Sequence, residues 1–422
     1  MQKQDDILLS QLTSIYSELD AAQIQRSPER VMDVLRRPPT DLDEDYFDAW
    51  LMADNIAQEI PALFMRDDRF PGDNVRMICL DAGRMGFYPN FIGAPMVRAL
   101  VQKRSPRLAI EWLQKVLSTT EASGSVVCAL WGLQVSSEVR LTPHLSIVPI
   151  NDIPESRNKT WLSEHRRQSS VASALDFTPV ESAIVARHTV RPFIAGPDDD
   201  GAEANAEYVK FCEMLNDVSL ALTVVGPRVV TIAAQWLTLD DPDLELAING
   251  SFRRSPLMEV LPLRSPTYPV LEGGEAKDVV QAFLGLSGEI RNKVRIALKR
   301  LSLAQYRHGV GDQCVELATA FETILSDGGN SEMTHKVKVR SVRLLGGSTT
   351  EREHNAAVMA WIYNARSKLV HTGIDETKNK QIGDTTYTPQ QLVDDAIRLC
   401  AQILCNVIKA GKIPAWGEFD IQ

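Results

Sequence analysis

The spacing of hydrophobic residues changes twice along this chain and divides it into three regions. Before residue 120 the apolar residues recur at helical spacing, most clearly at 5–22 and 94–117. From Gly124 onward, short runs rich in β-branched residues predict strands at 125–133, 137–141, 145–149, 183–194 and 229–239, with a helix at 207–225. After residue 275 the pattern is helical again, so a single all-helical or all-β fold is excluded.

This order predicts an α+β protein with three parts. Residues 1–119 form a helical N-terminal region, residues 120–270 a mixed α/β domain, and residues 275–422 an all-α bundle. The stretch 262–274 contains three prolines and ends in Gly273 and Gly274, so we expect it to be a linker. A length of 422 residues suits two or three domains.

Composition excludes several classes of protein. A hydrophobic content of 44% and a charged content of 24% are typical of globular domains. No apolar run reaches the roughly 18 residues of a membrane span, and the first residues do not read as a signal peptide, so we expect no membrane partner. The six cysteines show neither a C-x-x-C pair nor the spacing of a disulfide framework, which predicts reduced thiols and a cytoplasmic protein.

Charge is distributed unevenly. The chain has a net charge of −10, yet residues 291–371 contain 13 Lys and Arg against 7 Asp and Glu. A basic region in an acidic protein favours a local site for a polyanion such as RNA. Solvated helix faces are the alternative interpretation of the same charges.

The basic region ends in the segment Arg366-Ser367-Lys368-Leu369-Val370-His371, which closes a predicted helix over 350–370 before Gly373, a favoured helix stop. RNA can be cleaved without a metal when its 2′-OH attacks the adjacent phosphorus. An imidazole can transfer the protons, and a guanidinium can bind two phosphoryl oxygens. The pair Arg366 and His371 therefore suits RNA cleavage, with a structural arginine and a capping histidine as the alternative.

The spacing of this pair poses a geometric problem. Five residues of ideal helix turn through about 500°, which leaves the two side chains roughly 140° apart. One site can use both only if the helix end unwinds or if two subunits contribute.

Several segments around the motif resemble the Apea-like branch of the HEPN domains. Residues 312–325 resemble the acidic helix of that family, with Glu322 at its recurrent carboxylate, and 336–345 resemble its basic helix. Residues 363–371 are similar to its Y…RS…VH segment. Residues 389–410 resemble its closing helix, and Trp416 resembles the tryptophan in the segment that follows that helix. The resemblance covers roughly residues 275–420. It departs from the family at Thr372, which stands between His371 and the following glycine.

The resemblance implies a metal-independent endoribonuclease that works in phage defence or stress response as a homodimer. Arg366 and His371 would be catalytic, and Glu322 would orient Arg366 or act on a proton. Asn364 and Ser367 would support the arginine or the phosphate, and Arg340, Arg343 and Lys368 would contact RNA. An ion pair between helices is the alternative for Glu322, and polar helix faces for the others.

Two other functions compete with this reading. One is a non-catalytic HEPN scaffold for dimerisation or for binding RNA or a nucleotide. The other, a toxin neutralised by a nucleotidyltransferase partner, is disfavoured because Gly373 stands where such systems have a tyrosine.

We predict no cofactor and no metal site. The histidines and cysteines are scattered without zinc-site spacing, and no glycine-rich phosphate loop is present. The loop with Asp198, Asp199 and Asp200 offers three carboxylates, but it lacks the alternating spacing of a calcium loop. A trigger or regulatory partner of the N-terminal region is not specified by its sequence.

Overall fold

The structure, a computed structural model, describes residues 2–21, 55–64, 89–156, 158–159, 180–191, 202–248, 253–254, 269–327, 332–373 and 378–421. They form an α+β protein, as predicted. The chain divides into two compact units. The first comprises Met1–Val126, Arg187–Cys212 and Trp236–Phe252, and the second Val127–Ala186, Glu213–Gln235 and Arg253–Gln422. These boundaries differ from the predicted division at 119 and 270, which stays a prediction.

Helices make up most of the first unit: α1 (Gln2–Ala21), a helix over 55–64, α4 (Pro89–Lys103), α5 (Pro106–Ser118) and α8 (Pro242–Ala247). Pro106 opens α5 and so interrupts the helical stretch expected at 94–117, and Ser105 caps α5 by accepting a hydrogen bond from the Leu108 amide. Gly93 allows close contact between α4 and the helix over 55–64. A Cβ at that position would lie 1.7 Å from the carbonyl oxygen of Ala57.

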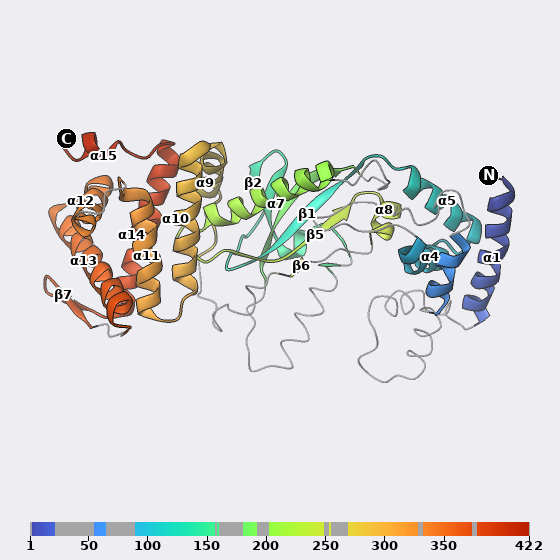
Figure 1. Cartoon of the computed structure of the whole chain (residues 1–422), viewed down its shortest axis with the longest axis horizontal. Coiled ribbons are helices and arrows are strands. Elements are labelled where there is room, and N and C mark those ends of the chain that lie inside the picture. The colour runs from blue at the N-terminus through green and yellow to red at the C-terminus, as the bar shows by residue number, and fades with distance from the viewer. Residues whose placement is uncertain are drawn as a thin grey trace. The chain divides into compact units, whose positions relative to one another are not determined.

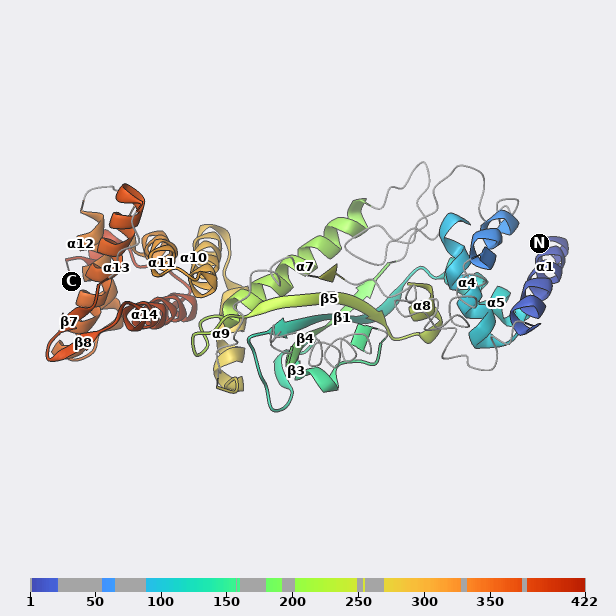
Figure 2. The ribbon, with the colours of Figure 1, turned by 90° about the horizontal axis from the view of Figure 1, so that it is seen from below.

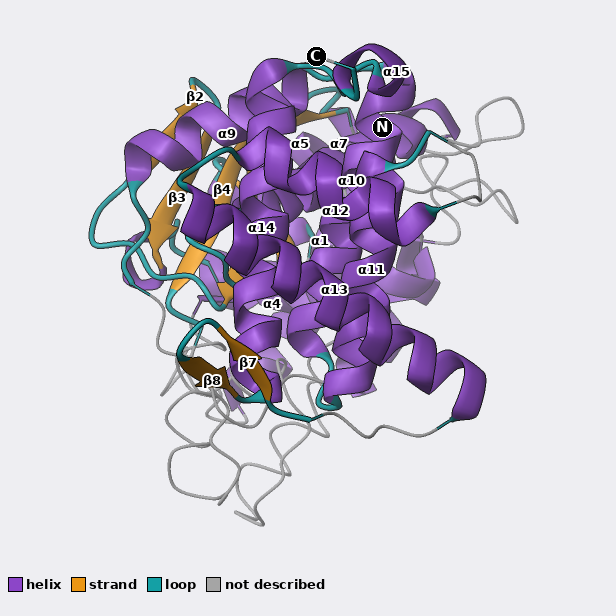
Figure 3. Ribbon diagram, turned by 90° about the vertical axis from the view of Figure 1, so that its left-hand side faces the viewer, coloured by secondary structure: helices purple, strands orange, loops and turns teal. Residues whose placement is uncertain are grey.

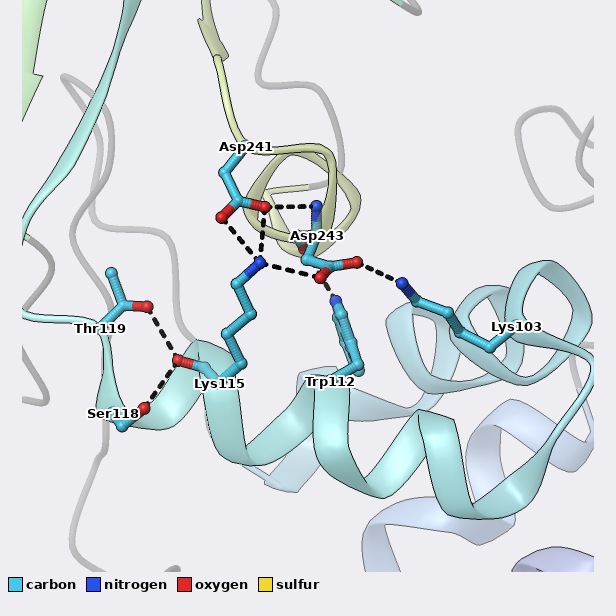
Figure 4. A network of polar contacts seen from close by, with 7 residues as sticks. All are labelled: Lys103, Trp112, Lys115, Ser118, Thr119, Asp241 and Asp243. Atoms are coloured by element: carbon cyan, nitrogen blue, oxygen red, sulfur yellow. Dashed lines mark hydrogen bonds and ion pairs between the residues drawn. The ribbon is translucent and has the colours of Figure 1, made fainter.

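Ion pairs join α8 to α4 and α5 in this unit (Figure 4). Lys103 Nζ lies 2.5 Å from Asp243 Oδ1, and Lys115 Nζ lies 2.9 Å from Asp243 Oδ2 and 2.7 Å from Asp241 Oδ2. The Trp112 indole donates a hydrogen bond to the Asp243 carbonyl. Hydrogen bonds from Lys103 and Lys115 lower the pKa of Asp243 below its ordinary value. Because these charges neutralise one another, we interpret the network as structural.

A six-stranded sheet has the order β2-β3-β4-β1-β5-β6. Its strands are β1 (Ala122–Trp131), β2 (Val139–Thr142), β3 (Leu145–Pro149), β4 (Ser182–Val190), β5 (Thr231–Leu239) and β6 (Arg253–Arg254). The pairs β2–β3, β3–β4 and β5–β6 are antiparallel. The central strands β1 and β5 are buried along most of their length. The first five strands confirm the sequence prediction, whereas the two-residue β6 was not predicted.

The predicted helix after β4 is α7 (Ala202–Leu222). Its C-terminal half lies along the sheet (Figure 2), where the Ser219 hydroxyl donates a hydrogen bond to the Val230 carbonyl at 3.1 Å. This half of α7 belongs to the second unit, together with the helices that follow.

The second unit continues as a helical bundle. Its helices are α9 (Gly273–Gly285), α10 (Gly288–Tyr306), α11 (Val310–Leu325), α12 (Met333–Leu345), α13 (Thr349–Thr372), α14 (Pro389–Ala410) and the short α15 (Trp416–Phe419). α10 packs on α11 and α14, and α13 packs on α11, α12 and α14 (Figures 1 and 3). Gly273 and Gly274, expected to end a linker, instead open α9. Residues 262–268 of that expected linker lie outside the described part of the chain.

Two short strands between α13 and α14 were not predicted. β7 (Lys380–Ile382) and β8 (Thr385–Tyr387) form an antiparallel hairpin at the edge of the bundle (Figure 3). Its turn contains Gly383 at φ 58°, a conformation that favours glycine. The Trp361 indole donates a hydrogen bond to the Lys378 carbonyl at 3.2 Å beside this hairpin. A large aromatic residue in the predicted helix at 350–370 would be expected in the core, but Trp361 is only half-buried beside the hairpin.

Among the residues that the structure describes, no helix is both long and apolar enough to cross a bilayer.

Candidate functional site

The candidate catalytic pair lies in the last two turns of α13. The helix continues regularly to Thr372, and Gly373 caps it at φ 68°, with its N–H donating to the Leu369 carbonyl at 2.9 Å. The helix end does not unwind, so Arg366 and His371 leave the helix about 140° apart. A single site that used both residues would therefore need a second copy of the chain, which stays a prediction.

The two residues belong to different faces of α13. Arg366 continues the face that carries the buried Met359, Ile362 and Tyr363, and its side chain is half-buried. His371 lies on the solvent face. Three predicted supporting residues share that exposed face at helical spacing: Asn364, Ser367 and Lys368.

Three polar groups come together on the buried side of this helix end. Glu322 on α11 and Arg366 on α13 are both half-buried, and neither forms an ion pair within 4 Å to any described residue. The Tyr363 hydroxyl is buried without a hydrogen-bond partner of normal geometry. Burial raises the pKa of Tyr363 far above its ordinary value; the charge of Glu322 raises it further, whereas Arg366 acts in the opposite direction. The three groups are therefore close neighbours.

Polar groups left unpaired in this way are unusual. A buried donor or acceptor without a partner costs about 1–3 kcal/mol, and most such groups in native proteins have a protein or water partner. The buried Tyr363 hydroxyl, with a half-buried carboxylate and a half-buried guanidinium close to it, is therefore a candidate site for a polar ligand. Sequence reasoning gave roles to Glu322 and Arg366 but none to Tyr363, although Tyr363 opens the Y…RS…VH segment. Its spacing of three residues from Arg366, which places both on one face, was the available signal.

The structure corrects the role predicted for Arg340. Its side chain is only 1% exposed, and its guanidinium lies 2.6 Å from Asp420 and 2.9 Å from Asp327. It also donates to the Leu325 carbonyl at 2.7 Å and lies 5.0 Å from the centre of the Trp416 ring. Arg340 thus holds the segment around α15 against α12 and cannot form the wall of an RNA groove.

The neighbouring basic residues remain accessible to different degrees. Arg343 is half-buried, with its guanidinium 4.8 Å from the centre of the Phe419 ring. Lys368 is exposed. Contact of these two residues with RNA stays a prediction.

The other histidine of α13 is already engaged. His354 Nε2 lies 3.0 Å from Asp395 Oδ2, and its ring lies 5.2 Å from that of Tyr387 on β8. Burial, together with the nearby charge of Arg398, lowers the pKa of His354. We therefore interpret His354 as a residue that links α13, α14 and the hairpin.

No group of three or more His, Cys, Asp or Glu side chains that could hold a metal ion occurs among the described residues. The acidic loop with Asp198, Asp199 and Asp200 lies outside them. Comparison of the chain with models of known families, with curated proteins and with solved structures gave no match.

Proposed function

We propose that the C-terminal helices form a metal-independent endoribonuclease of the HEPN type. One observation carries this proposal: Arg366 lies close to the Glu322 carboxylate and the buried Tyr363 hydroxyl, at the end of a helix that presents His371 to solvent. A guanidinium with free donors suits a phosphoryl group, and an exposed imidazole suits proton transfer.

In the proposed reaction the 2′-oxygen of RNA attacks the adjacent phosphorus. The bond from this oxygen to phosphorus forms while the bond to the 5′-oxygen breaks, which gives a 2′,3′-cyclic phosphate and a free 5′-hydroxyl. His371 takes the proton from the 2′-OH or donates a proton to the leaving 5′-oxygen. Arg366 binds the phosphoryl oxygens, and Glu322 and Tyr363 orient its guanidinium.

The regular end of α13 supports a composite site. Because Arg366 and His371 diverge by about 140° within one chain, we propose that two copies pair as a homodimer near residues 360–373. Each site would then combine groups from both copies. The residues before 270 would sense an unidentified trigger, in phage defence or stress response, and we propose a cytoplasmic location.

The test uses the full-length protein and total RNA in a buffer with EDTA. We expect the wild type to leave 2′,3′-cyclic phosphate ends, and Arg366→Ala and His371→Ala to lower the rate by about 10²–10⁴-fold. His335→Ala, at an exposed histidine on α12, is the matched control and should cleave normally. Equal cleavage by the wild type and His371→Ala, or a strict need for magnesium, would overturn the proposal.

A non-catalytic scaffold is the second candidate, favoured by the departure from the family pattern at Thr372. Here the dimer would bind RNA or a nucleotide without cleaving it. Unchanged RNA integrity with the wild type, together with saturable binding that Arg366→Ala weakens, would select this function.

A further inference from the structure

α10 carries a row of basic residues spaced four positions apart. Arg291, Arg295 and Lys299 occupy three successive positions of this row, and Arg307 follows directly after the last residue of the helix. Residues four apart form a continuous ridge on a helix surface. Each step of four residues turns the row by about 40° around the axis, so the face shared by Arg291, Arg295 and Lys299 is about 12 Å long. We call Arg291, Arg295, Lys299, Arg307 and the adjacent Arg300 the α10 basic row.

A buried carboxylate fixes the first part of the row. Asp217 on α7 has a side chain that is only 2% exposed. Arg295 binds it through two nitrogens, with Nε 2.7 Å from Oδ1 and a terminal nitrogen 2.5 Å from Oδ2. Arg291 binds it through one nitrogen at 2.9 Å.

A second buried carboxylate fixes the other end. Glu316 on α11 has a side chain that is 6% exposed. Arg307 binds it through Nε at 3.2 Å and a terminal nitrogen at 2.8 Å, and Arg300 binds it through one nitrogen at 2.9 Å. The side chains of Arg300 and Arg307 nonetheless remain 43% and 49% exposed.

Each carboxylate carries one negative charge and is therefore paired with two guanidinium groups, which carry two positive charges. Arg291 and Arg300 use one nitrogen each, so most of their N–H donors are not used by these carboxylates. Lys299, between the two clusters, is exposed and pairs with no described residue. The acidic residues nearby are Glu289, which pairs with Lys293, and the exposed Asp312 close to Arg307. A further exposed carboxylate, Glu213 on α7, acts on Arg295. Six basic residues on or beside the row thus face five acidic ones, which leaves an excess of one positive charge.

Charges held in this way suit a phosphate backbone. Guanidinium groups bind phosphate through two parallel donors, and side chains fixed before binding lose less conformational entropy on contact. At about 3.4 Å of axis per phosphate on one strand of a duplex, the stretch from Arg291 to Lys299 spans about three to four phosphates. A solvated helix face would not require two arginines on each buried carboxylate.

We propose that the α10 basic row is a docking surface for the phosphate backbone of RNA, separate from the Arg366 and His371 pair. The choice of RNA as the ligand rests on the proposed function. The row would hold a substrate strand along the bundle independently of its base sequence.

The experiment measures binding of a fluorescein-labelled 20-nucleotide single-stranded RNA by anisotropy. All proteins carry His371→Ala, so that no cleavage occurs. The test variant adds Arg291→Gln and Lys299→Gln, which remove two charges but leave Arg295 on Asp217. The control adds Lys277→Gln and Lys412→Gln, the same charge change at exposed lysines away from α10.

We expect the test variant to bind about tenfold more weakly at 0.1 M salt, and the slope of log K against log salt to fall by about 1.4. The control should stay within about twofold. Equal weakening in both variants would overturn the proposal. The proposal would also be overturned if a polyglutamate of similar length bound as tightly as RNA and the test variant lost that binding. The surface would then fit an acidic protein.

The outcome is independent of catalysis. If the wild type does not cleave RNA but the row variant loses binding, the nuclease proposal fails and the docking surface stands. If the wild type cleaves RNA and the row variant binds normally, the reverse holds.

Discussion

Tyr363 and Arg366 lie one turn apart on the same face of α13, close enough for the guanidinium to oppose the effect of Glu322 on the tyrosine pKa. The tyrosine hydroxyl is buried there without a hydrogen-bond partner of normal geometry. If Tyr363 serves only in packing, such a hydroxyl does not stabilise the fold. Removal of the hydroxyl therefore separates a role in packing from a role in function.

For Tyr363→Phe we predict an unchanged or slightly higher free energy of unfolding, because an unsatisfied buried hydroxyl is lost while the ring is kept. We also predict that RNA cleavage falls about tenfold or more. Urea denaturation and the rate of cleavage measure the two effects. Tyr387→Phe, on the exposed hairpin, should change neither, and wild-type cleavage by Tyr363→Phe would exclude a role for the hydroxyl.

Arg366→Ala and His371→Ala should change stability only on the order of 1 kcal/mol while they remove cleavage, because neither truncation opens a core cavity. The comparison variant on the same helix is Ile362→Ala, since Ile362 is fully buried whereas Trp361 is not. It should cost about 2–5 kcal/mol. Thermal and urea unfolding check both values. A loss for His371→Ala as large as that for Ile362→Ala would make the histidine a structural residue.

Arg340→Ala should destabilise the protein by about 2 kcal/mol or more, because it truncates a buried side chain and leaves the buried Leu325 carbonyl without its hydrogen-bond donor, whereas Asp327 and Asp420 are partly open to water. Arg343→Ala, one turn along α12, loses an accessible contact with an aromatic ring and should cost less than about 1 kcal/mol. Equal losses in the two variants would show that the burial of Arg340 contributes little.

The Arg340 and Asp420 pair should also respond to pH. Hydrogen bonds from Arg340 lower the pKa of Asp420 in the folded protein. The carboxylate therefore contributes stability above its ordinary pKa of about 4, and this contribution is lost as the pH falls through the lowered folded value. The difference in unfolding free energy between wild type and Asp420→Asn should be constant from pH 6 to 8 and should shrink below about pH 4. A difference that does not depend on pH would contradict this.

The composite site requires a dimer at micromolar concentration, which light scattering after size exclusion measures. Val370 is 55% exposed beside the motif, so Val370→Glu should produce monomers that no longer cleave RNA. Leu108→Glu, at an exposed leucine of the first unit, should remain dimeric. A wild-type monomer that cleaves RNA through Arg366 and His371 would exclude a shared site.

The sequence predicted the long elements well because their apolar periodicity is local. α14 and β3, for example, begin and end at the predicted residues. The β7–β8 hairpin was missed because its strands have three residues each and almost no apolar alternation. Arg340 was misjudged for a different reason. Its spacing from Arg343 suggested a shared surface, whereas its burial depends on Asp420, 80 residues away, which no local pattern reveals.

That separation of 80 residues also has a consequence for biosynthesis. At 5–20 residues per second, the ribosome needs about 4–16 s to pass from Arg340 to Asp420. During this interval the guanidinium of the new chain can pair with Asp327, which has already been made, but not with the carboxylate of Asp420 in the α15 segment. α12 can therefore settle into its final packing only after translation has passed Asp420, long after Glu322 has been made. A nuclease built on this bundle would mature late in synthesis, which delays its activity beside the ribosome that produces it.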